Sequence, residues 1–201
     1  MPAKSRFLFA AMIAVALPSA VLPSAAWAAD PPAGIKSVLQ TCVACHGPKG
    51  ISPMVGSPSL AGQPNIFLQY QLVFMRDGGR KPGVMSAVVK TLTDDHIREL
   101  GAYYESLAPP PPAKTGPVVE EAKAMALIKP RHCDNCHKED FSGQGESARL
   151  AGQRADYLVK SLKDFRSAER RGRGLGAMME VSATLKDEDI QTIAAYLARK
   201  P

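Results

Sequence analysis

The sequence predicts an all-α fold built from two similar halves. Apolar residues recur at helical spacing in several segments, and the alternating pattern of strands is rare. The tetrapeptide Leu-Ala-Gly-Gln occurs at 60–63 and again at 150–153, an offset of 90 residues. A run of prolines, Pro109–Pro112, lies between the two copies. A repeat of this length indicates two tandem domains rather than a solenoid of short repeats.

The first 28 residues are predicted to be a secretory signal peptide. Lys4 and Arg6 precede an apolar run from Phe7 to Leu17, and Ala26-Trp27-Ala28 offers a small-x-small cleavage site. The apolar run is shorter than the roughly 20 residues that span a bilayer. We therefore expect Sec-type export, cleavage before Ala29 and a periplasmic mature protein, with an uncleaved anchor as the alternative.

We expect the first domain at 29–107, a proline-rich linker at 108–117 and the second domain at 118–201. Consecutive prolines favour stiff polyproline II, so the linker is predicted to be a semi-rigid spacer that lets the domains pack together. The formal charge of +6 falls to +4 once a leader with Lys4 and Arg6 is removed, which gives little support to nucleic-acid binding.

The two halves predict matching sets of helices. In the first half, one helix runs into Cys42, a second extends from Pro64 to Met75, and a third starts after Thr93. Thr93 is a favourable N-cap, and two aspartates follow it in the first turn. The second half is expected to repeat this pattern with helices near 120–129, 154–165 and 187–199.

Each half contains one Cys-x-x-Cys-His motif, at 42–46 and at 133–137, and the two motifs use all four cysteines. This pattern is typical of covalent c-type haem attachment, in which two thioethers hold the porphyrin and the histidine is an axial iron ligand. The chain is therefore predicted to carry two haem c groups. The expected covalent attachment residues are Cys42, Cys45, Cys133 and Cys136, and the expected axial histidines are His46 and His137.

Other uses of a Cys-x-x-Cys pair fit less well. Zinc ribbons repeat the pair after about 15–20 residues, whereas Cys45 and Cys133 are 88 positions apart. A thioredoxin-type dithiol requires a βαβ context that the pattern lacks. A disulfide within each pair would leave both adjacent histidines without a role.

Each iron also needs a sixth ligand, and methionine is the favoured candidate. Met85 and Met178 each lie seven residues before a Leu of the repeat, Leu92 and Leu185, in glycine-rich loops. Methionine is more often core filler, but the repeated position favours ligation, which raises the reduction potential. Met179 remains a rival to Met178. His96 and His132, outside the motifs, are weaker alternatives, while Met54 and Met75 have no counterpart.

With these motifs, the chain resembles the dihaem cytochrome c4 family, which consists of two class I cytochrome c domains in tandem, each a small helical fold around a covalent haem. The resemblance covers the mature chain and implies His/Met ligation of both irons. It also implies that a proline carbonyl seven residues after the axial histidine accepts its second ring N–H. Pro53 has this position in the first half, but Gln144 has it in the second, so a carbonyl from Gly143 or Gln144 would serve His137.

The resemblance implies an electron carrier, not an enzyme, with no catalytic residues and no small-molecule substrate. It would shuttle single electrons between redox proteins, from a donor complex to a terminal oxidase or reductase. A membrane-bound oxidase and a quinol-oxidising complex are the candidate partners. The alternative is an oxidoreductase, or its haem subunit, such as a sulfur-compound dehydrogenase. No cysteine is spare as an unusual iron ligand, which favours the carrier.

Cations cluster before each candidate methionine. Arg76, Arg80 and Lys81 precede Met85, and a similar set precedes Met178. One or two of each set are candidates to pair with haem propionates. The segment 160–173 carries six cations, and we hypothesise that it steers an acidic redox partner.

Overall fold

The computed structural model describes residues 30–81, 83–171 and 176–201. Within these ranges the regular structure is helical, apart from an isolated bridge between Gln144 and Ser147. The all-α prediction is confirmed. The first half contains η1 (Ala33–Ile35), α1 (Lys36–His46), α2 (Asn65–Arg76), η2 (Gly83–Met85), α3 (Ser86–Val89) and α4 (Asp94–Ser106). The second half contains α5 (Glu121–Ile128), η3 (Lys129–Arg131), α6 (Cys133–His137), α7 (Ala155–Arg166), α8 (Gly176–Ala183) and α9 (Asp187–Ala198).

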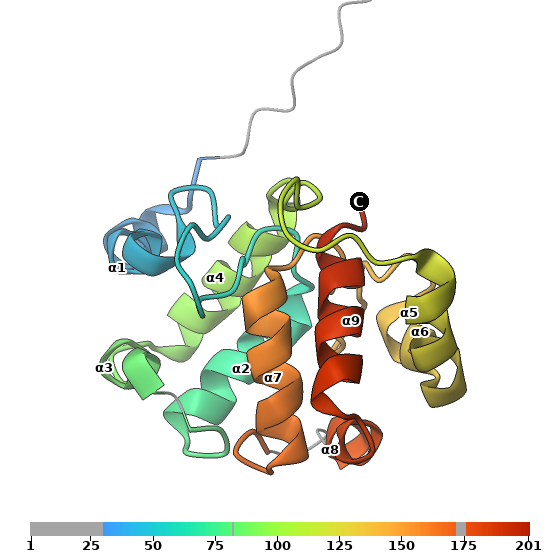
Figure 1. The fold of residues 1–201 in the computed structure, drawn as a ribbon. Coiled ribbons are helices and arrows are strands. Elements are labelled where there is room, and N and C mark those ends of the chain that lie inside the picture. The colour runs from blue at the N-terminus through green and yellow to red at the C-terminus, as the bar shows by residue number, and fades with distance from the viewer. Residues whose placement is uncertain (1–29, 82, 172–175) are drawn as a thin grey trace, which may run out of the picture.

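The same packing recurs in the two halves. Helix α2 lies against α4, and the equivalent α7 lies against α9 and α8. In Figure 1, α7 and α9 run side by side in the middle of the view, with α1 and α3 at one flank, α5 and α6 at the other, and α8 below α9. The helices that carry the Cys-x-x-Cys-His motifs therefore lie on opposite flanks.

Local sequence signals set the helix starts as expected. Pro64 is the N-cap of α2, and Thr93 is the N-cap of α4. The Thr93 hydroxyl accepts the His96 N–H at 3.1 Å, and His96 Nδ1 accepts the Thr93 N–H at 3.4 Å, which forms a capping box. The side chain of His96 thus caps the N-terminus of α4.

Two elements differ from the sequence expectation. The second motif does not continue the preceding helix, because His132 adopts a left-handed conformation (φ 52°) between η3 and α6. The segment around Met178 is helix α8 rather than a loop. Its residues include Ala, Met and Glu, which are good helix formers, and this local preference outweighs the flanking glycines.

Buried apolar residues form two clusters, each drawn from one half. The first consists of Ile35, Leu39, Ala61, Leu68, Leu92, Ile97, Leu100, Tyr104 and Leu107. The second consists of Ala124, Ile128, Phe141, Ala151, Leu158, Leu185, Ile190, Ile193, Ala194, Tyr196 and Leu197. Each half thus has its own core, formed by the helices that the repeat predicts.

The glycine of each Leu-Ala-Gly-Gln copy lies directly against the proline-rich segment. Gly62 and Gly152 have φ of +68° and +69°, a region that favours glycine. A Cβ at Gly62 would lie 2.8 Å from Pro109 Cβ, and one at Gly152 would lie 2.5 Å from the Pro110 carbonyl oxygen. The segment is therefore packed against both halves.

Among the described residues, no helix has the length and apolar character needed to cross a bilayer. The predicted signal peptide at 1–28 lies outside the described residues.

Candidate haem-binding site

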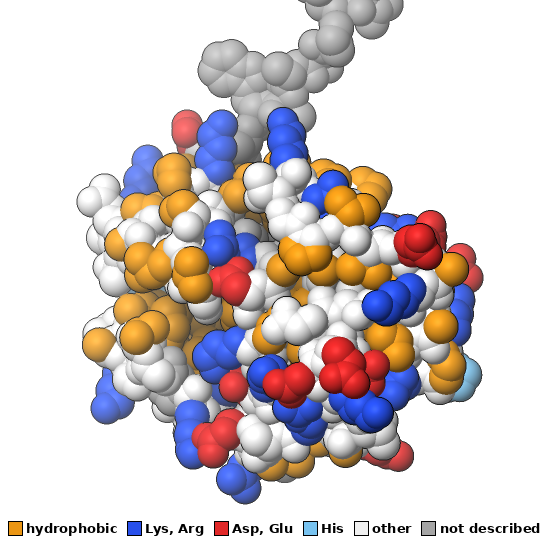
Figure 2. All heavy atoms as spheres, viewed as in Figure 1, with side chains coloured by type: hydrophobic (Ala, Val, Ile, Leu, Met, Phe, Trp, Pro, Cys, Tyr) orange, Lys and Arg blue, Asp and Glu red, His pale blue; other side chains and the backbone are white. Residues whose placement is uncertain are grey.

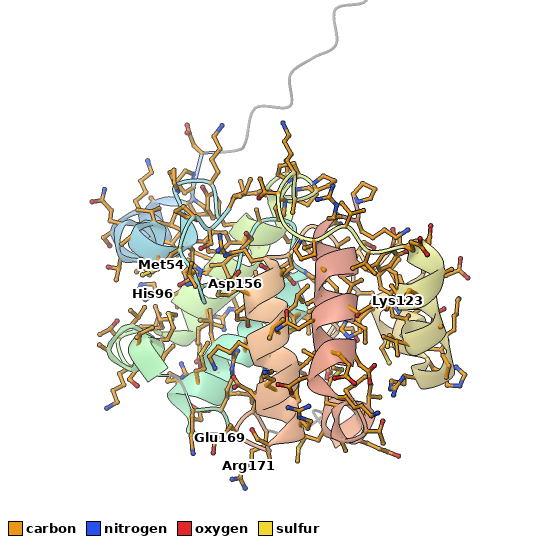
Figure 3. The ribbon with its side chains drawn as sticks, viewed as in Figure 1. Met54, His96, Lys123, Asp156, Glu169 and Arg171 are labelled. Atoms are coloured by element: carbon orange, nitrogen blue, oxygen red, sulfur yellow. The ribbon has the colours of Figure 1, made fainter. Side chains whose placement is uncertain are left out.

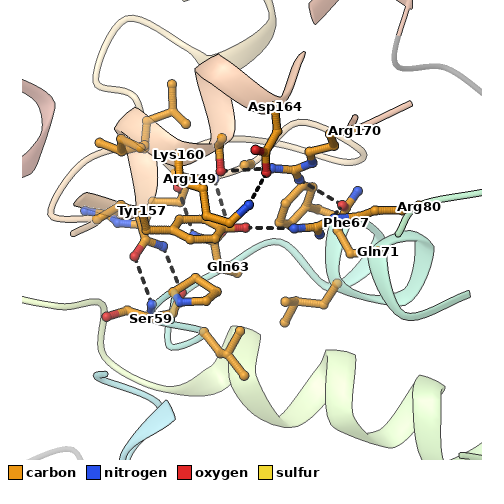
Figure 4. Close-up of a pocket in the computed structure, with 18 of the residues that line it drawn as sticks. Ser59, Gln63, Phe67, Gln71, Arg80, Arg149, Tyr157, Lys160, Asp164 and Arg170 are labelled. Atoms are coloured by element: carbon orange, nitrogen blue, oxygen red, sulfur yellow. Dashed lines mark hydrogen bonds and ion pairs between the residues drawn. The ribbon is translucent and has the colours of Figure 1, made fainter. Parts of the chain in front are cut away.

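A cavity of about 940 Å³ reaches into both halves of the molecule. Its wall is mostly apolar and contains both Cys-x-x-Cys-His motifs. The last turn of α1 positions the first motif, and α6 positions the second. A spacing of three residues places both sulfurs of a motif on one side of the helix turn, so both can face a single flat ligand. Figure 4 shows the part of the cavity between the halves.

The cysteines are available for thioether formation. All four are free thiols, and none pairs with another as a disulfide. Burial raises the pKa of the Cys42 and Cys133 thiols. Paired thiols beside an apolar cavity fit a covalently attached porphyrin.

Both candidate axial histidines are buried and held by a backbone carbonyl. Nδ1 of His46 lies 2.7 Å from the Pro58 oxygen, and Nδ1 of His137 lies 2.7 Å from the Ala148 oxygen. A proton on Nδ1 donates these bonds and leaves Nε2 unprotonated, as an iron ligand requires. Burial lowers the pKa of both imidazoles, which also favours the neutral form.

The expected carbonyl partners of these histidines were wrong. The imidazoles bond neither the Pro53 carbonyl nor those of Gly143 and Gln144; the partners lie twelve and eleven residues after the histidines. Residues 58 and 148 are equivalent in the repeat, directly before Ser59 and Arg149. The carbonyl that bonds each imidazole therefore lies four or five residues further along the chain than the expected seven.

Folding of these loops explains the late return. The Gly50 oxygen accepts the N–H groups of Leu60 and Ala61, and the Phe141 oxygen accepts the equivalent pair in the second half. These bonds bring the Leu-Ala-Gly-Gln segment back beside the motif. Gly47 makes the reversal possible, because a Cβ there would lie 2.2 Å from the Ile51 oxygen.

The candidate methionines line the same cavity. Met85 ends η2, and Met178 lies in the first turn of α8. Both are part of the cavity wall, whereas Met179 is not. Each half thus supplies one methionine thioether to the wall of the cavity that both motifs line.

The candidate propionate-binding arginines divide into two types. Arg76 and Arg166 bind the start of the last helix of their own half, through Asp94 at 2.8 Å and Asp187 at 2.6 Å. Arg80 and Arg170 instead line the cavity between the halves. Sequence spacing did not separate these two types, because only tertiary packing directs each side chain.

The comparisons agree with this site. The family model for cytochrome c matches residues 121–199. A thiosulfate dehydrogenase electron acceptor from Thiomonas intermedia is 35% identical over 88% of this chain and 84% of its own. Cytochrome c4 from Azotobacter vinelandii is 32% identical over 78% of this chain and 82% of its own. Reduced cytochrome c4 from Pseudomonas stutzeri superposes with a TM-score of 0.73 and 28% identity, covering 86% and 99% of the two chains.

The helical fold and the duplicated motifs define a class I c-type cytochrome with two haems, an electron-transfer protein. Within that class, the chain belongs to the cytochrome c4 family. It carries two covalently bound haem c groups and acts as an electron carrier with redox proteins as partners, not as an enzyme.

Proposed function

We propose that this cytochrome carries single electrons in the periplasm from a donor enzyme to a terminal oxidase or reductase. The observation that supports it best is the matched environment of the two histidines: each has Nδ1 on a carbonyl and Nε2 free, in a cavity that a methionine also lines. We propose thioether links at both cysteine pairs, with His46 and Met85 on the first iron and His137 and Met178 on the second.

The protein contributes orientation, burial and ligand choice. When bound, the haem iron supplies the one-electron chemistry. The Pro58 and Ala148 carbonyls hold the imidazoles in one tautomer, and the apolar wall excludes water. Thioether ligands favour the reduced state and raise the potential. A histidine and a methionine as the two axial ligands of each iron would leave no coordination position open for a substrate. This is consistent with electron transfer alone.

A sulfur-compound dehydrogenase is the proposed donor. The relative from Thiomonas intermedia is named a thiosulfate dehydrogenase electron acceptor. A solved thiosulfate dehydrogenase from Marichromatium purpuratum contains a region similar to 80% of this chain, with 31% identity and a TM-score of 0.71 over 36% of that chain. A permanent subunit role in such an enzyme is the alternative. Export by the predicted leader at 1–28 would deliver the chain to the periplasm.

The opening of the first half is the proposed docking face. Val55 and Val84 line the cavity wall and are 79% and 89% exposed. The segments 36–58 and 78–93 around them contain no carboxylate side chain of their own, and three of their five cations, Lys36, Lys49 and Lys90, are exposed. The other two are engaged, Lys81 with Glu169 and Arg80 with Gln71. Figure 2 shows hydrophobic side chains gathered on the flank of α1 and α3 and mixed charges over α7. This combination fits an acidic partner with an apolar centre.

The segment 160–173 is a weaker docking candidate than its composition suggested. Lys160 pairs with Asp164, and Lys163 and Arg166 both pair with Asp187. Arg170 is buried, and Arg171 is exposed at the lower edge in Figure 3. Arg173 lies outside the described residues. Most of these cations are therefore already neutralised or inaccessible.

The proposal is tested by the purified holoprotein with a thiosulfate dehydrogenase and thiosulfate. We expect two haems per chain, low-spin spectra and a methionine–iron charge-transfer band, with rapid reduction that slows as salt increases. Lys49→Glu should slow reduction more than Arg171→Glu, which makes the same charge change at the other site. A high-spin fraction that binds carbon monoxide would contradict the carrier, and equal effects of the two variants would contradict the docking face.

A further inference from the structure

Helices α4 and α9 place different side chains at one equivalent position. The Tyr104 oxygen accepts the N–H of Gly62 at 2.8 Å. In the second Leu-Ala-Gly-Gln copy, the Leu197 oxygen accepts the N–H of Gly152 at 3.1 Å. Tyr104 and Leu197 are both buried, and both line the cavity. The same backbone position therefore carries a phenol in the first half and an aliphatic side chain in the second.

A second difference between the halves compensates for the first. The oxygens of Gly50 and Phe141 accept equivalent pairs of N–H groups, so these two residues also correspond to each other. A Cβ at Gly50 would lie 2.9 Å from both Cδ1 and Cε1 of Tyr104, so a side chain there would collide with the ring. Phe141 is buried and lines the cavity, although its φ of 58° would favour glycine. Each half thus has one aromatic ring in this part of its core, contributed by α4 in the first half and by the loop after the motif in the second.

The two rings differ in polarity. The Tyr104 side chain is buried, and its hydroxyl has no hydrogen-bond partner within the described residues. A buried tyrosine hydroxyl usually has such a partner. Burial raises the pKa of Tyr104, and the neighbouring Cys42 thiol raises it further. The equivalent side chains of the second half, Phe141 and Leu197, carry no polar atom. Only the first half therefore has an unpaired hydroxyl at this place.

The neighbour of this hydroxyl is a proposed attachment residue. Cys42 packs against the core cluster that contains Tyr104, and both residues line the cavity. We propose that the Tyr104 hydroxyl donates to the Cys42 sulfur when the first haem is attached there, and that it raises the reduction potential of this haem but not of the second. This inference rests on the proposed attachment of the first haem at Cys42.

The direction of the effect follows from the dipole of the hydroxyl. A thioether sulfur is a weak acceptor, but within the described residues the hydroxyl has no stronger one. The donor presents its positive end to the haem in apolar surroundings. Since the oxidised iron carries the higher charge, the reduced state is favoured and the potential rises. The electron would then be retained in the first half, which carries the proposed docking face.

The experiment is a spectroelectrochemical titration of the holoprotein with Tyr104→Phe and the matched control Tyr103→Phe. Tyr103 is the adjacent residue of α4, but it is not part of the cavity wall. The midpoint that falls in Met85→Ala identifies the first haem. We expect this midpoint alone to fall in Tyr104→Phe and neither midpoint to move in Tyr103→Phe. Redox-difference infrared spectra should contain a tyrosine C–O band that disappears only in Tyr104→Phe.

The double variant Phe141→Gly/Leu197→Tyr provides the converse test, because it transfers the first-half arrangement to the second half. We expect the midpoint of the second haem to rise. A second midpoint that stays unchanged, with both methionine–iron bands retained, would overturn the proposal.

Unchanged midpoints in Tyr104→Phe, or an equal shift in Tyr103→Phe, would also overturn the role of Tyr104 in proteins that retain two haems. Haem content and the methionine–iron band of the parent protein test the attachment itself. A parent protein without the first haem would overturn the proposed function together with this inference, whereas the variant results bear on Tyr104 alone.

Discussion

Gln153 binds both backbone groups of Ser59 in the opposite half. Its Oε1 accepts the Ser59 N–H at 2.8 Å, and its Nε2 donates to the Ser59 oxygen at 2.9 Å. Gln63 binds Arg149 in the same way, at 3.0 and 2.8 Å. Ser59 and Arg149 each precede a Leu-Ala-Gly-Gln copy, so the contact is reciprocal, like the isologous interface of a symmetric dimer. The repeated tetrapeptide therefore holds the halves together.

Gln153→Ala should destabilise the protein by about 1–3 kcal/mol, because it leaves two buried backbone groups of Ser59 without partners. Gln63→Ala should have a similar effect through Arg149. Denaturant unfolding of the holoprotein measures the change. Gln191, exposed on α9, is the matched control, and Gln191→Ala should alter the free energy of unfolding little. Equal losses at positions 153 and 191 would show that the reciprocal bonds contribute nothing.

Gly62→Ala should be more destabilising than Gly56→Ala. Both glycines have positive φ, +68° and +78°, so each substitution introduces strain of about 1–2 kcal/mol. Gly56 has open space around a Cβ, whereas Gly62 has Pro109 at 2.8 Å. The linker contact should add about 1–3 kcal/mol to the Gly62 variant. Thermal unfolding of the two holoproteins measures the difference. Identical melting temperatures would show that the proline-rich segment can move away from residue 62 without a cost in stability.

Met85→Ala and Met178→Ala should each remove the methionine–iron charge-transfer band of one haem and lower the potential of that haem. The reason is the loss of a thioether that favours reduced iron. Met179→Ala should keep both bands, because Met179 is not part of the cavity wall. Absorption spectra and redox titrations distinguish the three variants. If the band were lost in Met179→Ala and kept in Met178→Ala, Met179 and not Met178 would be the ligand of the second iron.

Asp187 should stabilise the protein above about pH 4 and lose this effect on acidification. Hydrogen bonds from Lys163 and Arg166 lower the pKa of its carboxyl. The folded state therefore binds its proton less readily than the unfolded chain, and stability falls as pH drops through the folded pKa. Asp187→Asn should flatten the decline of melting temperature below about pH 4. Glu188→Gln removes the same charge from the same helix turn without these partners and is the matched control. An equal change in both variants would contradict the role of the Lys163 and Arg166 bonds.

Much of the architecture could be predicted because its signals are local. The Cys-x-x-Cys-His spacing, the N-cap at Thr93 and the proline before α2 each act within a few residues. Periodic apolar residues predicted which helix faces would be buried. Because the sequence repeats, each helix predicted in the first half also predicted one in the second. Helix α8 escaped prediction because glycines near Met178 suggested a loop, while the helix-forming residues beyond Gly176 prevailed.

The carbonyl groups that bond the histidine side chains could not be predicted from local sequence signals. Pro53 has the right sequence distance from His46, but the path of the loop back from Gly50 to Leu60 brings Pro58 to the imidazole instead. A loop that is closed by long-range hydrogen bonds has no fixed relation between sequence distance and spatial contact. The repeat offered one usable signal, since Pro58 and Ala148 precede equivalent positions.

The sequence by itself determined the helices, the duplication and the residues able to hold two haems, because covalent attachment motifs and helix signals are short and chemically specific. Only the tertiary structure decided which residues meet between the halves. It directed Arg76 to a helix end but Arg80 and Arg170 to a common buried point. Residues about 90 positions apart are brought together by packing, and no local pattern encodes which of several similar side chains will be buried there.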